Sequence, residues 1–501
     1  LGGIDILGLN LQLGQMLKVL EVFVPVIKKS SVEGYQSGLI VQSEGINDKD
    51  ACGYAGGYVG KLIGGQIWGE NNAHCQVTKL RRVDGRSYVG GFVGSSKPGS
   101  AATVDPTAGE GLFLSKLLNK LLNAPADFIK VMDATVATIR CADVISWDDW
   151  GIIVNGVHSG EGSNTFYAKA AGGFAGSLVG TVLGKKDTKE AGISAQGIRS
   201  VIAGEYAGGF FGIADVDAGV QVSGKTETEL FKYLLQLGRT DVLDAFRTYV
   251  YDGSVSGSAD AGLSVSAHIA VKSGQNDAVT YSGTAGGFGG SLLNSSVKNS
   301  SVTKLSNVSG RNSTGGFIGY SGKSGVVDLN KIDVLGNNQW QLLGGAAGVL
   351  DVFGSHIEDS SVAGVDGGYT VQSSGGEEQI AGGFIGYANL ARMSGCIAGD
   401  SNIQANGLKQ VASGGTAGGF AGSYEYLGNI DLDSTLVNAL LTILNQLVKA
   451  LYLDKLQAAN LLNINLGIIQ IKAAYEGDLL SVNLLGLKIS VGLSKASTEN
   501  Q

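Results

Sequence analysis

The segment Ser146–Gly151, with the sequence SWDDWG, holds the densest group of side chains in this chain that could do chemistry. Trp147 and Trp150 offer flat apolar rings on which a sugar could stack. Asp148 and Asp149, between them, offer acceptors for sugar hydroxyl groups, and paired carboxylates at a suitable separation also hydrolyse glycosides. Successive side chains of a strand point to opposite faces, so these two carboxylates would not converge there. We expect an exposed turn whose tryptophans pack on an inserted helix, with glycan contact as the functional alternative.

The other residue types that commonly carry catalysis are scattered along the chain. A zinc site or a catalytic triad needs side chains that converge, and the spacing of the histidines provides no such cluster. The histidines are His74, His158, His268 and His356. The four cysteines form no CxxC pair, which argues against a zinc ribbon or a thioredoxin-like motif. The sequence therefore predicts no catalytic residue, no metal ligand and no cofactor.

Residues Gly219–Thr226 match the P-loop pattern, in which a glycine-rich backbone wraps phosphates and a lysine reaches the terminal ones. In this chain Val220–Val222 has the character of a strand rather than of a curled loop. We therefore expect a strand that leads into a helix capped by Thr226.

The chain that must position these residues has an unusual composition. It has 80 glycines and 4 prolines in 501 residues. The glycine share is more than twice the usual share of about 7 %, and the proline share is far below the usual share of about 5 %. Collagen needs abundant proline and disordered linkers lack apolar residues, but 44 % of this chain is hydrophobic. The net charge of −8 provides no electrostatic footprint for nucleic acid. In the apolar stretch Ser434–Leu453, residues such as Asn438 and Lys449 argue against a membrane span.

A short motif recurs eight times: a small or β-branched residue, two glycines, an aromatic residue, any residue, and another glycine. The glycine pairs and aromatic residues are Gly56-Gly57-Tyr58, Gly90-Gly91-Phe92, Gly172-Gly173-Phe174, Gly208-Gly209-Phe210, Gly286-Gly287-Phe288, Gly315-Gly316-Phe317, Gly382-Gly383-Phe384 and Gly418-Gly419-Phe420. Glycine fits a tight corner at which neighbouring backbones approach closely, and the aromatic ring would point into a core. Each motif is therefore expected to be structural.

The copies come in pairs, which makes four modules of roughly a hundred residues. Apolar stripes such as Leu112–Leu122 and Leu436–Leu451 predict helices between and after the modules. We divide the chain into an N-terminal apolar strand or helix segment (1–30), module 1 (31–100), a helical insertion (101–135), module 2 (136–222), a helical insertion (223–250), module 3 (251–325), an insertion (326–356), module 4 (357–424), and a C-terminal helix and strand segment (425–501).

Stacked coils that each cover their neighbour would bury one continuous apolar column. The sequence therefore predicts a mainly β protein: a parallel β-solenoid, or β-helix-like repeat fold, with α-helical insertions between modules. If about 300 residues form coils of roughly 23, the stack has on the order of 13 coils.

The Gly-Gly-Phe-x-Gly pattern, set among Ser-Val strands, resembles the GLUG-type repeats of large bacterial surface proteins, although those usually carry leucine at the aromatic position. The resemblance covers about half of the chain and implies an exported, extracellular cell-surface protein of adhesin or stalk type. Cys52 and Cys75 lie about one predicted coil apart, so at an oxidising surface they are candidates for a disulfide between neighbouring coils.

We expect a non-enzymatic, extracellular structural or adhesive repeat protein of a bacterial cell surface. One alternative is a subunit of a self-assembling extracellular filament or surface layer, in which apolar stripes form subunit contacts. Another is a carbohydrate-active enzyme or glycan-binding protein built on a β-helix. The expected partners are other surface proteins, host glycans or copies of the chain itself, and not nucleic acid.

Overall fold

The computed structural model describes residues 24–44, 53–99, 136–159, 165–186, 192–216, 247–269, 283–322, 354–389, 391–395 and 403–425, together with several separate strands. All regular structure in these parts of the chain is β-strand. The helical insertions predicted for 101–135 and 223–250, and the insertion predicted for 326–356, fall almost wholly outside the described residues. No helix occurs among the residues that the structure describes.

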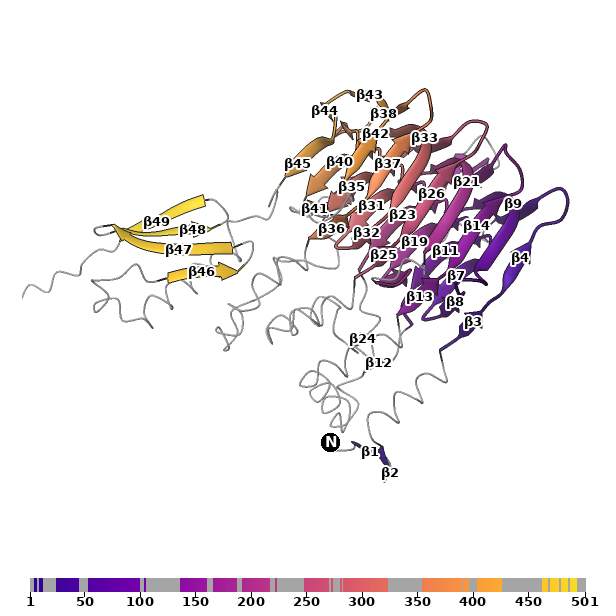
Figure 1. Cartoon of the computed structure of the whole chain (residues 1–501), viewed down its shortest axis with the longest axis horizontal. Helices are drawn as coiled ribbons and strands as arrows, with labels where there is room; N and C mark the ends of the chain where they lie inside the picture. The colour runs from indigo at the N-terminus through magenta and orange to yellow at the C-terminus, as the bar shows by residue number, and fades with distance from the viewer. Residues whose placement is uncertain are drawn as a thin grey trace, which may run out of the picture.

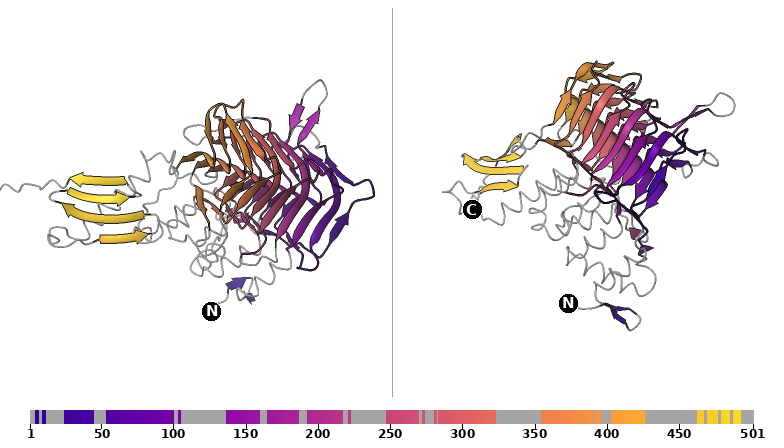
Figure 2. Two further views of the ribbon diagram at one scale, coloured as in Figure 1. Left: turned by 45° about the horizontal axis from the view of Figure 1, so that its top comes forward. Right: turned by 45° about the vertical axis from the view of Figure 1, so that its right-hand side comes forward.

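The described residues form a parallel β-solenoid of eight coils, stacked in chain order (Figures 1 and 2). Each coil passes through four sheets in the same order and carries one copy of the glycine motif. We call these the short, long, glycine and fourth sheets.

The short sheet opens each coil. Its strands are β3 (Val26–Lys28), β8 (Gln66–Trp68), β13 (Ala137–Arg140), β20 (Thr181–Leu183), β25 (Tyr249–Tyr251), β32 (Ser296–Lys298), β36 (Ser355–Glu358) and β41 (Ala391–Ser394).

The long sheet follows. Its strands are β4 (Ser31–Glu33), β5 (Leu39–Ser43), β9 (Cys75–Gly85), β14 (Ala142–Ser146), β15 (Ile152–Asn155), β21 (Ile193–Ala203), β26 (Gly253–Gly257), β27 (Leu263–Ala267), β33 (Ser301–Gly310), β37 (Ser361–Gly364), β38 (Tyr369–Ser373), β42 (Gln404–Asn406) and β43 (Leu408–Ser413).

The glycine sheet comes third and holds the first glycine of each motif. Its strands are β6 (Tyr54–Gly56), β10 (Tyr88–Gly90), β18 (Ala170–Gly172), β22 (Tyr206–Gly208), β30 (Thr284–Gly286), β34 (Ser313–Gly315), β39 (Ile380–Gly382) and β44 (Thr416–Gly418).

The fourth sheet closes each coil just after the aromatic residue. Its strands are β7 (Val59–Ile63), β11 (Val93–Lys97), β19 (Ala175–Val179), β23 (Phe211–Asp215), β31 (Gly289–Leu293), β35 (Ile318–Gly322), β40 (Ile385–Asn389) and β45 (Ala421–Glu425).

The motif aromatics form one continuous stack through the core. Neighbouring ring centroids are 4.5–5.0 Å apart, and neighbouring ring planes differ by only 1–10°. This spacing equals the distance between hydrogen-bonded strands, about 4.7–4.9 Å, because each ring belongs to one coil. The six phenylalanines from Phe92 to Phe384 are fully buried, whereas Phe420, in the last coil, is 41 % exposed.

The motif requires glycine because the backbones of neighbouring coils approach each other closely there. A methyl group on Gly91 would lie 2.0 Å from the carbonyl oxygen of Gly173 in the next coil, and one on Gly94 would lie 2.5 Å from that of Gly60 in the preceding coil. Since real Cβ atoms do not come this close to backbone, a larger residue at either position would force the coils apart.

The coils are longer and fewer than predicted. The described residues form eight coils rather than about 13, because a coil is longer than 23 residues: coil 2 runs from Gln66 to Lys97 and contains the 11-residue strand β9. The first coil also begins earlier than residue 31, since β3 is its short-sheet strand.

Odd and even coils differ in a regular way. In each odd coil the long strand is interrupted by a loop that ends in a glycine with positive φ: Gly38 (φ 85°), Gly151 (φ 100°), Gly262 (φ 71°) and Gly368 (φ 78°). In each even coil a single positive-φ residue replaces the loop: Lys79, Gly197, Lys304 and Gly407. The structural period is therefore two coils, like the pairing of motif copies in the sequence.

The long connections follow the same period. Residues 98–136, 216–248 and 323–354 leave the fourth sheet after coils 2, 4 and 6 and return to the short sheet of the next coil. The described strands that flank these connections all meet at one corner of the solenoid, between the fourth sheet and the short sheet. At the same corner, the odd coils connect to the following coil through one or two residues, such as 64–65 and 294–295.

Several strands lie outside the solenoid sheets. Three of the described pairs are antiparallel hairpins: β1 (Ile4–Ile6) with β2 (Leu9–Leu11), β16 (Val157–Ser159) with β17 (Thr165–Tyr167), and β28 (Lys272–Ser273) with β29 (Thr280–Tyr281). A four-stranded antiparallel sheet consists of β46 (Leu462–Leu466), β47 (Ile469–Glu476), β48 (Leu479–Leu484) and β49 (Leu487–Gly492). In the P-loop-like segment, β24 (Gln221–Val222) is a strand that pairs in parallel with β12 (Thr103–Val104). The predicted helices at Thr226 and Leu436–Leu451 lie outside the described residues.

Removing a ring from the middle of the aromatic stack should be costly. Phe288→Ala deletes a fully buried ring that stacks on Phe210 and Phe317, and we expect a loss of about 3–5 kcal/mol in the free energy of unfolding. Phe420→Ala, at the exposed end of the same stack, should cost clearly less. Denaturant unfolding of the two variants measures the difference, and equal losses would contradict the stack.

Buried tyrosines should make the fold sensitive to alkali. Burial raises the pKa of Tyr320 to about 12, and burial also raises the pKa values of Tyr206, Tyr369 and Tyr387 above 10. A tyrosine whose pKa is higher in the folded state stabilises the fold while it is protonated. This contribution is complete below pH 10 and decreases as pH rises toward 12.

We therefore expect unfolding and tyrosinate absorbance to appear together above pH 10, and Tyr320→Phe to remain folded to a higher pH. Tyrosinate absorbance that develops fully while the circular dichroism spectrum stays native would contradict the burial of these side chains.

Candidate functional site

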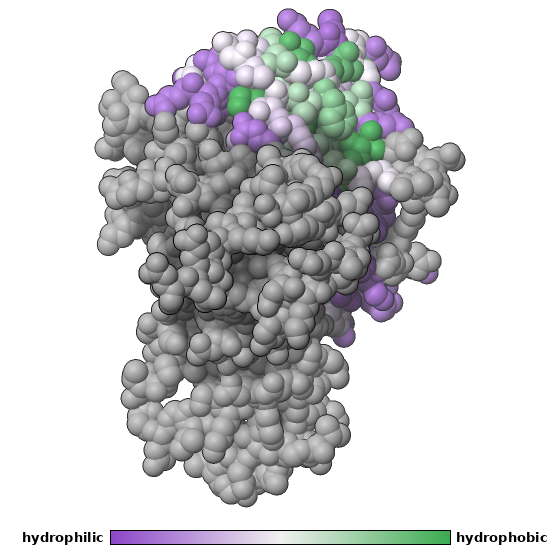
Figure 3. All heavy atoms as spheres, turned by 90° about the vertical axis from the view of Figure 1, so that its left-hand side faces the viewer, coloured by the Kyte–Doolittle hydropathy of each residue, from purple (hydrophilic) through white to green (hydrophobic). Residues whose placement is uncertain are grey.

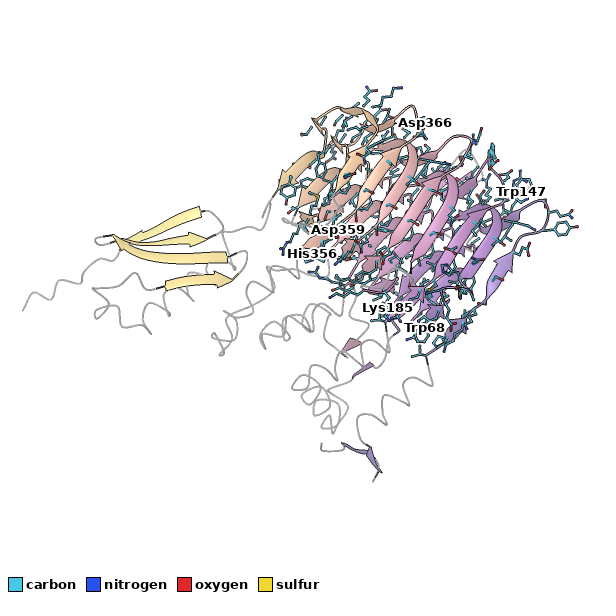
Figure 4. All side chains as sticks on the ribbon, viewed as in Figure 1. Trp68, Trp147, Lys185, His356, Asp359 and Asp366 are labelled. Atoms are coloured by element: carbon cyan, nitrogen blue, oxygen red, sulfur yellow. The ribbon has the colours of Figure 1, made fainter. Side chains whose placement is uncertain are left out.

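The loop Trp147–Gly151 in coil 3 brings the four predicted glycan-contact residues together on the surface. It lies between β14 and β15 of the long sheet, and Figure 4 shows Trp147 at the edge of the stack formed by that sheet. Asp148, Asp149 and Trp150 are exposed, and 43 % of Trp150 is open to solvent. We call this segment the aromatic loop.

Trp147 is the structural member of the aromatic loop. Its Nε1 donates a hydrogen bond to the carbonyl oxygen of Gln36 in coil 1, at 2.8 Å. Its ring lies beneath Gly38 and 5.5 Å from the guanidinium carbon of Arg81 in coil 2. Trp147 therefore fastens the aromatic loop to the two preceding coils.

Trp150 is the member that is free to meet a ligand. One face is covered by Arg199 of coil 4, whose guanidinium carbon lies 4.4 Å from the ring centroid. Arg199 also donates to the carbonyl oxygen of Trp150 at 3.1 Å and to Asp260 Oδ2 of coil 5 at 2.8 Å. These contacts hold an exposed indole in a fixed orientation.

The two carboxylates of the aromatic loop play different parts. Asp148 Oδ1 accepts a hydrogen bond from the backbone N–H of Gly151 at 3.2 Å and so closes the turn, as an aspartate commonly does. The carbonyl oxygen of Asp149 accepts from the backbone N–H of Asp260 at 3.2 Å, and its side chain is exposed.

The exposed turn thus has the predicted form, but the described contacts of its tryptophans are with arginines of neighbouring coils. The register of the long sheet brings Arg81 and Arg199 alongside them, and the inserted helix expected to cover them falls outside the described residues.

A second polar cluster lies at the start of the long sheet and joins three coils. Asp143 accepts hydrogen bonds from His74 Nδ1 at 2.7 Å, from Ser194 Oγ at 2.6 Å and from Gln76 Nε2 at 3.2 Å. A cavity of about 370 Å³ beside it is lined by Asn71, His74, Asp143, Ser194, Asp252 and Ser254, among others. We call this cavity the histidine groove.

The arrangement in the histidine groove does not match a catalytic triad. In a triad the histidine stands between the serine and the aspartate, so that it can take the serine proton. Here Asp143 stands in the middle and accepts from both Ser194 and His74. Ser194 therefore has no histidine base within this cluster.

A neighbouring hollow lies on the short-sheet side of the loop at Gly69–Asn72. Its volume is about 480 Å³, and Trp68 lines it with the cations of Lys28 and Arg140 5.2 and 5.7 Å from the indole centroid. Figure 4 shows Trp68 at the opposite side of the stack from Trp147, so the hollow is separate from the aromatic loop.

Sequence reasoning missed the histidine groove. His74, Asp143 and Ser194 are distant in the chain, and only the register of β9, β14 and β21 brings them together. The one available signal was their place relative to the motif, since each residue lies near the start of a long strand. Within the described parts of the chain, no group of three His, Cys, Asp or Glu residues could hold a metal ion.

Cys75 is a buried free thiol at the start of β9. Its predicted partner, Cys52, lies outside the described residues, so the disulfide stays a prediction. Cys141 is also buried, and burial raises its pKa.

No protein-family profile and no curated protein matches this chain. Among solved structures, the chain is similar to a Bacteroides ovatus protein provisionally assigned as an immunoglobulin A1 protease, with 11 % sequence identity over 82 % of each chain. The TM-score is 0.29, so this likeness carries no argument about function. Within the described residues no helix is long and apolar enough to cross a membrane.

Asp143→Ala should destabilise the chain, because it leaves His74, Ser194 and Gln76 without their shared acceptor. We expect a loss of about 1–3 kcal/mol in the free energy of unfolding. Asp149→Ala removes an exposed carboxylate and should change it by less than about 0.5 kcal/mol. Denaturant titrations compare the two, and equal effects would show that the cluster is not formed in solution.

Proposed function

We propose that this chain is a non-enzymatic structural or adhesive repeat protein of a bacterial cell surface, and that the aromatic loop contacts glycans. The observation that carries the proposal is the fixed, exposed Trp150, framed by Asp149, Arg199 and Asp260. An exposed aromatic ring with acceptors and donors at its rim can stack on a sugar ring and hydrogen bond its hydroxyls.

The scaffold supports this proposal through the regular spacing of its loops. Loops on the odd coils occur at every second coil of one sheet, at a spacing of about 10 Å. They are Gly34–Gly38, Trp147–Gly151, Ser258–Gly262 and Val365–Gly368. Because the loops belong to parallel strands in register, they form a row along the long sheet, which is suited to contact with an extended ligand. Tyr35, which is 77 % exposed, stands in the first loop of this row.

The carboxylates of the aromatic loop support binding more than hydrolysis. Asp148 is hydrogen bonded within its own turn and Asp149 projects from the exposed side of it, so they do not face one glycosidic bond. The GLUG-type resemblance of the eight motifs supports the surface location.

Trp150→Ala should weaken glycan binding about tenfold or more, since it removes the exposed stacking surface while Trp147 still anchors the turn. The measurement is binding of the full chain to an array of bacterial and host glycans, followed by calorimetry with each glycan that binds. Lys298→Ala, on the short sheet, is the matched surface control.

Unchanged binding by Trp150→Ala would exclude the aromatic loop as the contact. Turnover of a glycan that is abolished by Asp148→Asn or Asp149→Asn would contradict the non-enzymatic proposal.

A further inference from the structure

The two ends of the solenoid are open among the described strands. There the last coil has no neighbour on β41, β42, β43, β44 and β45, and the first has none on β3, β4, β5, β6 and β7. At each end, therefore, the strands of four sheets pair with no further described strand, and such an edge is a template for pairing with further strands. Phe420 and Tyr424 are 41 % and 51 % exposed at the last coil, and Figure 3 shows hydrophobic surface at this end, flanked by hydrophilic side chains.

At two motif positions in the end coils, nothing in the described part of a single chain requires glycine rather than a larger residue. A methyl group on the second glycine of any earlier motif would lie only 1.9–2.2 Å from a carbonyl oxygen of the following coil, whereas a methyl on Gly419 would meet nothing within 4 Å. The third glycine of a later motif faces the preceding coil, but Gly60 meets only its own Tyr54 carbonyl oxygen, at 3.1 Å. Both glycines keep the space that a neighbouring coil would need.

We propose that copies of this chain stack head to tail, with the last coil of one against the first coil of the next. Gly419 would then receive the carbonyl oxygen of Gly57, and Gly60 would receive that of Gly422, as in every internal pair of coils. This inference concerns assembly and does not depend on the proposed glycan contact.

The two-coil period agrees with this stacking. Inside the chain, each long connection leads from an even coil to an odd coil. The proposed junction is of the same kind, because coil 8 is even and coil 1 is odd. The strand β45 ends, and β3 begins, at the same corner as the strands that flank the connections 98–136, 216–248 and 323–354. The chain beyond each end would therefore leave the stack at a corner that is built for such connections.

Side chains also match across the proposed junction. Continuing the internal register places Phe420 on Tyr58, Val411 on Val41 and Ala417 on Ala55. The rings of Phe420 and Tyr58 would extend the aromatic stack into the next copy at the same spacing.

The charges at the junction are compatible. In the same register the charged residues Lys28, Glu33 and Lys61 of coil 1 face Ser394, Asn406 and Ser423 of coil 8. No like charges are opposed in these pairs, and Glu425 lies two residues from Ser423, diagonal to Lys61, where opposite charges attract. A non-closing head-to-tail contact of this kind generates a filament.

The test compares glycine substitutions in the full chain by sedimentation velocity over a range of concentrations. The wild-type chain should form species larger than dimers. Gly419→Ala should raise the concentration needed for assembly by about tenfold or more, because the added methyl holds the next coil away. Gly367→Ala is the matched control, because a methyl there also meets nothing within 4 Å but lies in a loop of coil 7, which is not an end coil.

A mixture identifies the direction of assembly. Gly419→Ala keeps an intact first coil and Gly60→Ala keeps an intact last coil, so the two together should form one-to-one dimers and stop there. Phe420→Glu is a second variant for the last coil, and circular dichroism checks that each variant is folded.

Three results would overturn the proposal: a wild-type chain that stays monomeric at all concentrations, a Gly419→Ala chain that assembles like wild type, or a mixture of the two glycine variants that continues into long species.

Discussion

The close approach of backbones at the glycine motifs is the constraint on which the rest of this structure depends. Successive coils meet there with so little space that a methyl group on the second or third glycine would collide with a neighbouring carbonyl oxygen. The glycines permit the coil spacing that strand hydrogen bonding sets, and this spacing places the motif aromatics at 4.5–5.0 Å in one column. The core is therefore an outcome of glycine placement, and the glycine excess of the composition is concentrated where the backbone requires it.

The alternation of odd and even coils determines where loops project from the long sheet. Once the core is fixed, the long sheet can vary, and it does so at every second coil: a loop in the odd coil and one positive-φ residue in the even coil. Arg81 and Arg199 of the even coils lie against the loops of the odd coils and hold Trp147 and Trp150 in place. The surface that supports the proposed glycan contact is thus tied to the same two-coil period that organises the long connections.

The sequence predicts the part of this fold that repeats. Eight motif copies were enough to infer parallel stacking and a buried aromatic column, because the motif itself carries the contact between coils. The number of coils was wrong, since it depends on strand length and loops that the motif does not encode. The cluster of His74, Asp143 and Ser194 could not be predicted, because these residues meet only through the register of three separate coils. The arginines beside the tryptophans were missed for the same reason.

Electron cryomicroscopy of the full chain tests the central claim most directly, because it shows the stack itself. The account predicts parallel strands repeating at about 4.8 Å, with the aromatic side chains from Tyr58 to Phe420 in a single column at that spacing. A map in which the motif phenylalanines are not aligned, or in which the strands of successive coils do not pair in parallel, would contradict it.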